Sequence, residues 1–395
     1  EYDDSEYAKE YQIKQEKREE LRPLLESVIR KYEKAFEDLP EDHPAKIEVY
    51  QKRKYNPEIV EAYRIGYAPG RKFIYNLCVE NGRKHDAIEL GLINENNDKW
   101  YDRVIYPLID RKGTSLAPVG LAGRRLSDDN KYAKWMNSSD SELYQKDVFW
   151  YGMDKAREEI VKQGEAWLVE GYNDVIAWQT NGIPNTIASC GTAIARKQMH
   201  ALKKLCSKIV FCFDPDGAGK TAMLKYIPEF IRLGFRVQMV FLSPSLDPDD
   251  FVRFWDSSVK KFSLADLGTN PDYREDGFKF LMAESFKGKD EIDIAKETKT
   301  LSLLIAKIED EAMRSIYADW LAKESGVKAT QIKSYLNASV EKIIKTLTPA
   351  EDEFYRLPPS VKSPLDNLRP TIERYQLFMA NTQIWIQGKN GPPYS

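Results

Sequence analysis

The chain has 395 residues, of which 42% are hydrophobic and 31% charged, enough for roughly two or three domains of ~150 residues with buried cores. Its 59 Lys and Arg residues nearly balance 62 Asp and Glu residues, so the net charge of -3 excludes a global basic field, and any nucleic-acid partner must be held by a local patch. The apolar runs are far shorter than the ~20 residues of a membrane span and the N-terminus is acidic, so we expect a soluble, cytoplasmic protein without a membrane partner.

The N-terminal residues 1–95 are predicted to form a helical lead-in. Residues 1 to about 37 are rich in charge and helical in character, and this helix should end before Pro40. Short amphipathic helices follow, one of which opens at Pro57, and the stretch YRIGYAPG (63–70) predicts a turn-rich break between them.

Strands are predicted in the next segment, an α+β subdomain at 96–160. The stretch DRVIYPLIDRKGTSLAPVGLAGR (102–124) contains two apolar runs around a Lys112-Gly113 turn. Two such runs around a turn are typical of a β-hairpin.

Strands and helices alternate from Glu165 to about Phe254, and we assign this segment to a domain at 161–262. Alternation of this kind predicts a largely parallel sheet with helices on both faces, because right-handed crossovers return the chain to the same sheet. The four predicted strands are AWLVEG (166–171), NTIAS (185–189), KIVFCF (208–213) and RVQMVFL (236–242). The fold class is therefore α/β.

The C-terminal third is predicted to be helical at 272–346. One apolar stripe there follows helical spacing and is expected to face the core rather than a partner. Its members are Met313, Ile316, Tyr317, Trp320 and Leu321. A Pro-rich linker and a pair of strands at 347–395 are expected to begin a further domain.

The four cysteines predict buried thiols in a reducing compartment. They contain no CxxC pair, which supports neither a disulfide framework nor a zinc site in this chain. They are Cys78, Cys190, Cys206 and Cys212.

Carboxylates follow three of the four predicted parallel strands. Each alone has an ordinary explanation as a helix cap, a turn residue or a solvated residue, but the ends of parallel strands meet at one edge of a sheet. Six acids at one edge repel one another unless cations lie between them, and oxygen ligands of this kind suit Mg²⁺ or Mn²⁺. Such a site can hold two metals for phosphoryl transfer. The acids are Glu170, Asp174, Asp214, Asp216, Asp247 and Asp249.

The stretch FCFDPDGAGKT (211–221) also resembles the end of a nucleotide-binding P-loop. The motif GxxxxGK[ST] would require glycine at position 214, where the chain has Asp214, whose charge would oppose a phosphate. We therefore reject a P-loop ATPase. Gly217 and Gly219 are instead predicted to permit the turn into the next helix. Lys220 is left without an assigned role, and a contact with phosphate remains open for it.

Several motifs in order resemble DnaG-type primases of bacteria and phages. EGYND (170–174), IASCGTA, FDPDGAGKTA and LDPDDFV are similar to the motifs of their Toprim domain. Upstream, NPEIVEAYRIGYAP, DRVIYPLIDRKG, GLAGRRL and the stretch from Lys134 to Ala156 are similar to the rest of the primase RNA polymerase domain, and the helices after about 275 to its closing helical subdomain. The resemblance covers roughly residues 40 to 340.

The resemblance implies the catalytic core of a DNA-dependent RNA primase, which makes short primers on single-stranded DNA by two-metal nucleotidyl transfer. It implies that Glu170, Asp214 and Asp216 are catalytic and that all six acids form the metal site. It further implies that basic and polar residues hold template DNA or nucleoside triphosphate, although near-balanced charge from residues 124 to 146 is also typical of a solvated face. These residues are Arg103, Arg124, Arg125, Lys134, Asn137 and Lys146.

The resemblance also implies partners and marks departures. The partners are a single-stranded DNA template, nucleoside triphosphates and a replicative helicase in cis or in trans, in a bacterial or phage-infected cell. The zinc module that usually precedes this core is not found here. Trp135 stands where Tyr is more frequent, so that stacking on a base and packing in the core both remain open. Asn173 replaces the usual Met, from which little effect is expected.

Two other functions remain open on the sequence. A Toprim nuclease or topoisomerase-like enzyme would use the same acids to cleave DNA. A non-catalytic Toprim module would serve a replication protein as a scaffold or DNA-binding part, although six mutually repelling carboxylates argue against it.

Overall fold

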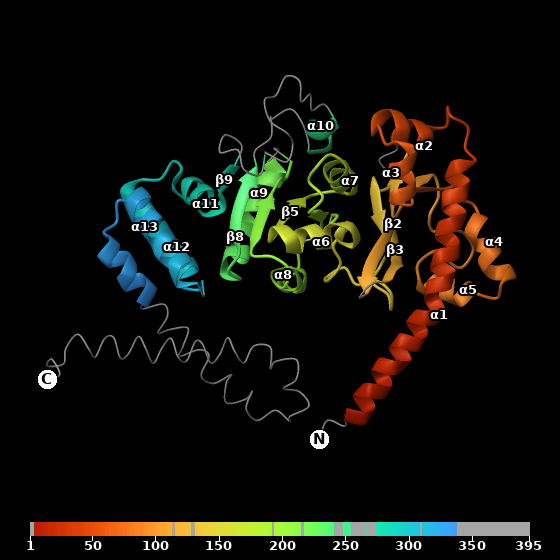
Figure 1. The fold of residues 1–395 in the computed structure, drawn as a ribbon, viewed down its shortest axis with the longest axis horizontal. Helices are drawn as coiled ribbons and strands as arrows, with labels where there is room; N and C mark the ends of the chain where they lie inside the picture. Colours follow the sequence, from red (N-terminus) through yellow and green to blue (C-terminus); the bar gives the residue numbers. More distant parts are fainter. Residues whose placement is uncertain are drawn as a thin grey trace. The chain divides into compact units, whose positions relative to one another are not determined.

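The structure is a computed structural model (Figure 1). It describes residues 4–112, 115–127, 131–191, 193–214, 217–240, 248–253, 267, 274–308 and 310–337. The chain divides into two units, Glu16–Ser339 and Glu1–Gln15 with Val340–Ser395. Of the second unit, the structure describes only the beginning of helix α1 (Asp4–Glu37). The linker and strand pair predicted at 347–395 lie outside the described residues.

An antiparallel sheet of four strands lies in the N-terminal half of the first unit, in the order β1-β2-β3-β4. The predicted hairpin is confirmed, because β2 and β3 pair along their length. Strand β1 was not predicted, since three residues are too few to show an alternating pattern; it lies inside the expected break and pairs Gly66 with Ile105. The strands are β1 (Gly66–Ala68), β2 (Arg103–Lys112), β3 (Ser115–Arg125) and β4 (Trp135–Asn137).

Helices surround this sheet, and the long charged N-terminal helix is confirmed. Helix α1 buries Leu21, Leu25 and Ile29 in a core shared with α4 and α5, while its charged residues remain at the surface. The helices are α1 (Asp4–Glu37), α2 (Pro44–Lys46), the π-helix η1 (Ile47–Lys52), α3 (Pro57–Ala62), α4 (Phe73–Glu80), α5 (Lys84–Glu89) and α6 (Met153–Gln163).

The second sheet has the order β6-β5-β7-β8-β9, and its first four strands are parallel, as predicted. The edge strand β9 is antiparallel to β8, so the prediction that everything after residue 272 is helical is wrong for this short segment. Its three residues acquire strand geometry from the open edge of β8 rather than from a pattern of their own. The strands are β5 (Glu165–Val169), β6 (Thr186–Ala188), β7 (Lys208–Phe211), β8 (Arg236–Val240) and β9 (Arg274–Asp276).

Both faces of the parallel sheet are covered, because alternate residues of each strand enter different cores. Leu168 and Phe211 pack with residues of α8 and α9, whereas Trp167, Val169 and Val210 pack with residues of α7 and α10 and of the antiparallel sheet. The helices are α7 (Tyr172–Thr180), α8 (Arg196–Lys203), α9 (Gly217–Arg232) and α10 (Pro248–Arg253). The second core therefore joins the two sheets.

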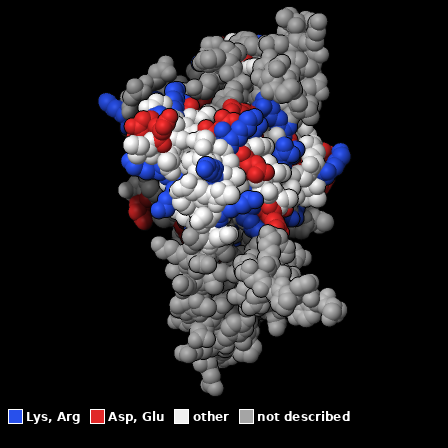
Figure 2. Space-filling view, turned by 90° about the vertical axis from the view of Figure 1, so that its left-hand side faces the viewer, with Lys and Arg blue, Asp and Glu red and all other residues white. Residues whose placement is uncertain are grey.

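Three further helices complete the unit: α11 (Gly277–Phe286), α12 (Glu291–Ile305) and α13 (Glu311–Ser325). The predicted stripe on α13 is confirmed for Tyr317 and Leu321, which are buried, but it is wrong for Ile316, which is 48% exposed. On the side where α12 and α13 lie in Figure 1, Lys or Arg and Asp or Glu side chains are interspersed (Figure 2), as on a solvated helical face.

The predicted buried thiols are confirmed, because all four cysteines are free and buried. Among the described helices, none is both long enough and apolar enough to cross a bilayer.

Candidate active site

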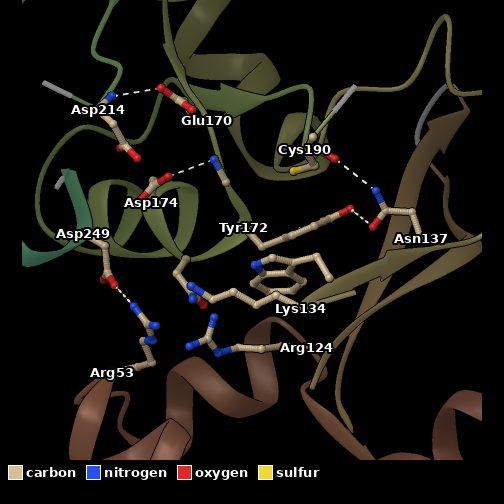
Figure 3. Close-up of a pocket in the computed structure, with 14 residues that line it drawn as sticks. Arg53, Arg124, Lys134, Asn137, Glu170, Tyr172, Asp174, Cys190, Asp214 and Asp249 are labelled. Carbon is tan, nitrogen blue, oxygen red and sulfur yellow. Dashed lines mark hydrogen bonds and ion pairs between the residues drawn. The ribbon is translucent and has the colours of Figure 1, made fainter. Parts of the chain in front are cut away.

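A pocket of about 410 Å³ lies where β5 and β7 end and faces the antiparallel sheet (Figure 3). Its lining includes acidic residues from the parallel-sheet domain and basic residues from the N-terminal half of the chain. The acids are Glu170, Asp174, Asp214 and Asp249, and the cations are Arg53, Arg124 and Lys134.

The structure brings the four predicted acids that it describes to the lining of one pocket. Glu170 follows β5, Asp174 lies in the first turn of α7, Asp214 follows β7, and Asp249 lies in the first turn of α10. Helices and strands of different sequence regions thus bring them to one cavity. Asp216 and Asp247, also predicted to belong to this site, lie outside the described residues.

Backbone hydrogen bonds orient two of these carboxylates, those of Glu170 and Asp174. The Asp214 amide donates to Glu170 Oε1 at 3.0 Å, which connects the end of β7 to the end of β5. The Gly171 amide donates to Asp174 Oδ2 at 2.8 Å, so Asp174 caps the first turn of α7. A carboxylate at a helix N-terminus is favoured by the helix dipole, and this placement holds Asp174 at the rim of the pocket.

Gly219 allows α9 to begin directly beside these acids. A Cβ atom at this position would lie 2.8 Å from Glu170 Oε1 and closer still to the Asp214 carbonyl oxygen. The close approach of the helix requires glycine here, which explains the residue without a P-loop.

The rest of the GAGKT segment agrees with this interpretation. Helix α9 begins at Gly217, and the Thr221 hydroxyl donates to the Gly217 carbonyl oxygen at 2.6 Å. Lys220 Nζ forms an ion pair with Glu284 of α11 at 2.8 Å and is not among the described residues that line the pocket. The segment is therefore the first turn of a helix, as predicted, and Lys220 contacts α11 rather than a phosphate site.

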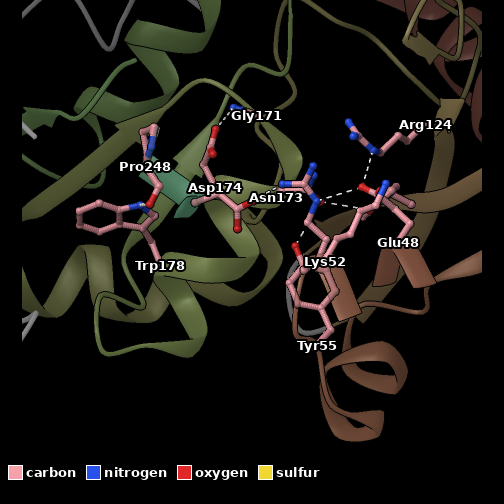
Figure 4. Close-up of polar contacts among 12 residues, drawn as sticks. Glu48, Lys52, Tyr55, Arg124, Gly171, Asn173, Asp174, Trp178 and Pro248 are labelled. Carbon is pink, nitrogen blue, oxygen red and sulfur yellow. Dashed lines mark hydrogen bonds and ion pairs between the residues drawn. The ribbon is translucent and has the colours of Figure 1, made fainter. Parts of the chain in front are cut away.

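Asp249 is buried and paired with Arg53, a residue that sequence analysis missed. Asp249 is 1% exposed and forms an ion pair with an Nη atom of Arg53. Arg53 Nε donates to Glu48 Oε1 at 3.0 Å, and Arg124 Nε lies 2.7 Å from the same oxygen (Figure 4). Nothing in the local pattern KIEVYQKRK distinguishes these side chains from a solvated charged helix.

Ionisation of this cluster follows from its neighbours. Burial by itself raises the pKa of Glu48, but the charges of Arg124 and Arg53 outweigh burial and hold that pKa below its usual value. Burial also disfavours the charged form of Arg53, yet Asp249 and Glu48 together raise its pKa. Glu48 and Arg53 therefore each favour their charged forms.

The negative charge of the pocket acids affects the pKa of a nearby buried thiol, that of Cys212. Burial raises the pKa of Cys212 well above its usual value, and the charges of Asp174, Asp214 and Glu170 raise it further. The three carboxylates therefore lie close enough to Cys212 to act on the same thiol.

Of the predicted nucleotide or template residues, Arg124, Lys134 and Asn137 line the pocket. Asn137 accepts a hydrogen bond from the Tyr172 hydroxyl at 2.8 Å and donates to the Cys190 carbonyl oxygen at 3.0 Å. Its amide thereby holds the loop after β6 against the antiparallel sheet.

Arg103, Arg125 and Lys146 are not among the described residues that line this pocket. Arg103 is buried and donates to the carbonyl oxygens of Gly123 and Ala133, each at 3.0 Å. Its guanidinium therefore holds the backbone that leads to the pocket residue Lys134.

Arg125 and Lys146 make their contacts away from the pocket lining, in the N-terminal half of the chain. Arg125 donates to the carbonyl oxygens of Ser127, at 2.7 Å, and Tyr132. Lys146 is half-buried beside Lys99; burial lowers the pKa of Lys99, and the charge of Lys146 lowers it further.

Aromatic residues form the floor between the two sheets. Trp135 lines the pocket and also packs against Tyr172, with ring centroids 4.8 Å apart, and against Tyr106, at 5.2 Å. Packing is therefore established for Trp135. Asn173 has a larger structural role than expected, because its Oδ1 accepts hydrogen bonds from the hydroxyls of Tyr55 and Tyr106, each at 3.1 Å.

One group outside the pocket has the residue types of a metal site: His85, Asp86 and Glu89. Lys17 pairs with Asp86 and with Glu89, both at 3.3 Å, and Arg83 pairs with Asp86. Because these cations already neutralise the carboxylates, the group is a surface ion-pair network.

Comparisons with known proteins agree with the two-part architecture. Residues 35–157 match the family model "DNA primase catalytic core, N-terminal domain", and residues 167–252 match the model "Toprim-like". A DNA primase of Aquifex aeolicus is 33% identical over 215 residues, 52% of this chain and 42% of that protein. A DNA primase of Halalkalibacterium halodurans is 28% identical over 358 residues, 87% of this chain and 55% of that protein.

A solved structure shows the same fold. The crystal structure of a DNA primase domain from Pseudomonas aeruginosa superposes with a TM-score of 0.68 and 26% identity, covering 80% of this chain and 99% of that one. The chain spans about half the length, or less, of the curated relatives described above. With a primase catalytic-core domain followed by a Toprim-like domain in this order, the chain belongs to the DnaG-type DNA primases and contains their catalytic core.

Proposed function

We propose that this chain is a nucleotidyltransferase that joins nucleoside triphosphates into short primers on a single-stranded DNA template. The observation that carries the proposal is the pocket itself, in which four carboxylates and three cations converge in a chain of the primase family. Phosphoryl transfer needs both kinds of group, because acids hold divalent ions while basic side chains bind the phosphates.

The donor set fits Mg²⁺ or Mn²⁺. Four carboxylates converge on one cavity, and hard oxygen ligands are those that these ions prefer. Glu170, Asp174, Asp214 and Asp249 would hold the ions, together with Asp216 and Asp247 of the same motifs. When bound, such ions neutralise phosphate charge and lower the pKa of the attacking 3′-hydroxyl.

The chain's own basic residues bind and orient the triphosphate. Arg53 and Arg124 present planar guanidinium groups that can each engage a phosphate through two hydrogen bonds, and Lys134 adds a point charge. Holding the reacting groups in line supplies a large part of the rate in reactions of this class.

Template DNA is proposed to contact the surface around β3 and β4. Arg125 and Lys146 lie in this part of the chain, and Arg103 fixes the backbone that carries Lys134. Contacts to phosphate imply that template affinity falls with salt. A replicative helicase, in cis or in trans, and a bacterial or phage-infected cytoplasm complete the proposal.

Primer synthesis on single-stranded DNA tests the proposal directly. Wild-type protein with triphosphates and Mg²⁺ or Mn²⁺ should extend new primers, and Asp214→Ala or Glu170→Ala should abolish synthesis while far-ultraviolet circular dichroism remains unchanged. Labelled single-stranded DNA without triphosphates provides the contrast, since cleavage there would favour a Toprim nuclease. A folded variant of either acid that still makes primers would overturn the site assignment.

A further inference from the structure

One buried carboxylate serves two arginines of the pocket. Glu48 is 5% exposed, and its Oε1 atom lies 3.0 Å from Arg53 Nε and 2.7 Å from Arg124 Nε. Both arginines line the pocket, whereas Glu48 is not among the described lining residues and therefore lies behind them.

The backbone of η1 places Glu48 beside Arg53. In this π-helical turn the Arg53 amide donates to the Glu48 carbonyl oxygen at 3.0 Å, five residues back in the chain. An α-helix brings residues three or four apart together, so only the wider turn puts residues 48 and 53 one above the other. π-helical turns are rare in proteins, and those that occur are often found at functional sites.

The second arginine comes from a distant part of the chain. Arg124 lies in β3, where it pairs with Trp135 of β4, and its guanidinium lies over the Trp135 ring at 5.7 Å. Glu48 therefore joins a residue that follows η1 to a residue of the sheet, and through Arg53 it also reaches Asp249 of the Toprim-like domain. The sequence of charges Arg124, Glu48, Arg53, Asp249 crosses the pocket from one domain to the other.

The charge of Glu48 is what allows the two arginines to stay together. Their side chains are 14% and 15% exposed, so water screens their mutual repulsion less than at an open surface. A carboxylate between them converts that repulsion into two attractions, whereas a neutral group of the same shape would not. Without it, the guanidinium groups should separate and lose their common direction into the pocket.

We propose that Glu48 is a positioning residue for the triphosphate site: it fixes the separation and direction of Arg53 and Arg124, so that both can engage the phosphates of one nucleotide. This inference rests on the proposed primase function. It assigns Glu48 no contact with substrate, and it predicts an effect on triphosphate affinity rather than on the chemical step.

The substitution Glu48→Gln removes the charge and keeps the shape. We expect the KM for nucleoside triphosphate in primer synthesis to rise about tenfold, equivalent to ~1.4 kcal/mol, with kcat within about threefold of wild type. The dissociation constant of a fluorescent nucleoside triphosphate should rise by a similar factor, which gives a readout independent of synthesis. Glu48→Asp keeps the charge on a shorter side chain, so its KM and its dissociation constant should lie between those of wild-type protein and Glu48→Gln.

Glu165 provides a matched control. Like Glu48, it is a buried carboxylate paired with cations, here Lys208 and Arg274, each at 2.8 Å. It lies, however, at the start of β5, the strand end opposite the pocket. Glu165→Gln should lower the Tm as a lost buried ion pair does, and leave the KM unchanged.

The outcomes separate the two proposals. If wild-type protein makes primers and Glu48→Gln shows the same KM and nucleotide affinity as Glu165→Gln, Glu48 only stabilises the fold and this inference is wrong, while the primase function stands. If Glu48→Gln does not fold, a wild-type KM in Glu48→Asp overturns the inference and an increased one supports it. If wild-type protein neither makes primers nor binds the triphosphate, both proposals fail.

Discussion

The Asp214 amide donates a hydrogen bond to Glu170 Oε1 at 3.0 Å, so a backbone group of one strand end orients the carboxylate of the neighbouring strand end. Strands β5 and β7 pair directly, which brings these two residues together although they are far apart in sequence. Helix α9 follows Asp214 and approaches both residues closely at Gly219, so the positions of Glu170 and Asp214 also depend on this approach.

Gly219→Ala should damage the site without unfolding the chain. The new Cβ would meet the Glu170 carboxylate and the Asp214 carbonyl group, and displacing either by a fraction of an ångström should lower primer synthesis at least about tenfold. Gly217→Ala, in the same first turn of α9, is the control, because a Cβ atom at that position meets nothing within 4 Å. Equal activity of the two variants would show that the close approach is not required.

Divalent metal should stabilise the folded protein by binding the four carboxylates that line the pocket. A ligand that binds only the native state at 100 times its Kd adds ~2.7 kcal/mol to the free energy of unfolding, so Mn²⁺ should raise the Tm of wild-type protein. Asp214→Ala should reduce this increase, whereas Asp319→Ala, a change at an exposed position of α13, should keep it. A Tm increase that is identical in all three proteins would place the metal elsewhere.

Asn173→Ala should destabilise the contact between the two sheets. Asn173 is buried and accepts hydrogen bonds from two buried tyrosine hydroxyls, those of Tyr55 and Tyr106, which the substitution leaves without this acceptor. A loss of about 2 kcal/mol in the free energy of unfolding is expected from urea denaturation. The exposed Asn96→Ala is the comparison, and an equally small change in both would argue that water replaces the lost acceptor.

The cysteine thiols should be unreactive in the folded state at mildly alkaline pH. Burial raises the pKa of Cys78 to about 11 and that of Cys206 to about 12, and it raises the pKa values of Cys190 and Cys212 well above their usual value. Because the reactive form is the thiolate, a disulfide reagent at pH 8.5 should label the native protein slowly and all four thiols rapidly in urea.

The raised pKa values of the buried thiols also predict how the free energy of unfolding changes with pH. A thiol whose pKa is higher in the folded state than in the unfolded state stabilises the fold below the unfolded value and ceases to do so as pH rises. The urea midpoint should therefore fall as the pH is raised through 9, the usual thiol value, and Cys206→Ala should flatten part of that decrease. Rapid labelling of a native thiol would instead indicate local opening.

The parallel strands and the acids at their ends were predictable from sequence. A buried strand is a short apolar run with a clear end, and the carboxyl ends of parallel strands share one edge, so Glu170, Asp174, Asp214 and Asp249 could be grouped before any coordinates were known. The rejection of a P-loop rested on the identity of residue 214 alone, and the start of α9 at Gly217 agrees with it.

Other features were decided only by tertiary structure. Strands β1 and β9 have three residues each and take their conformation from the partner strand at the sheet edge, not from a period of their own. Ile316 follows the helical spacing of its neighbours and is nevertheless exposed, because the breadth of the contact surface on α13 is set by the helices that pack against it.

The basic residues that line the pocket, Arg53, Arg124 and Lys134, were likewise brought together only by tertiary structure. Local sequence around Glu48 and Arg53 is that of a charged surface helix, and nothing in it specifies a π-turn or a partner more than 190 positions away. By itself, the sequence determined where the strands end and which residues follow them, since hydrophobic period and strand direction are local properties. Only the folded chain decided which cations face those acids, because charges attract according to distance in space and not according to position along the sequence.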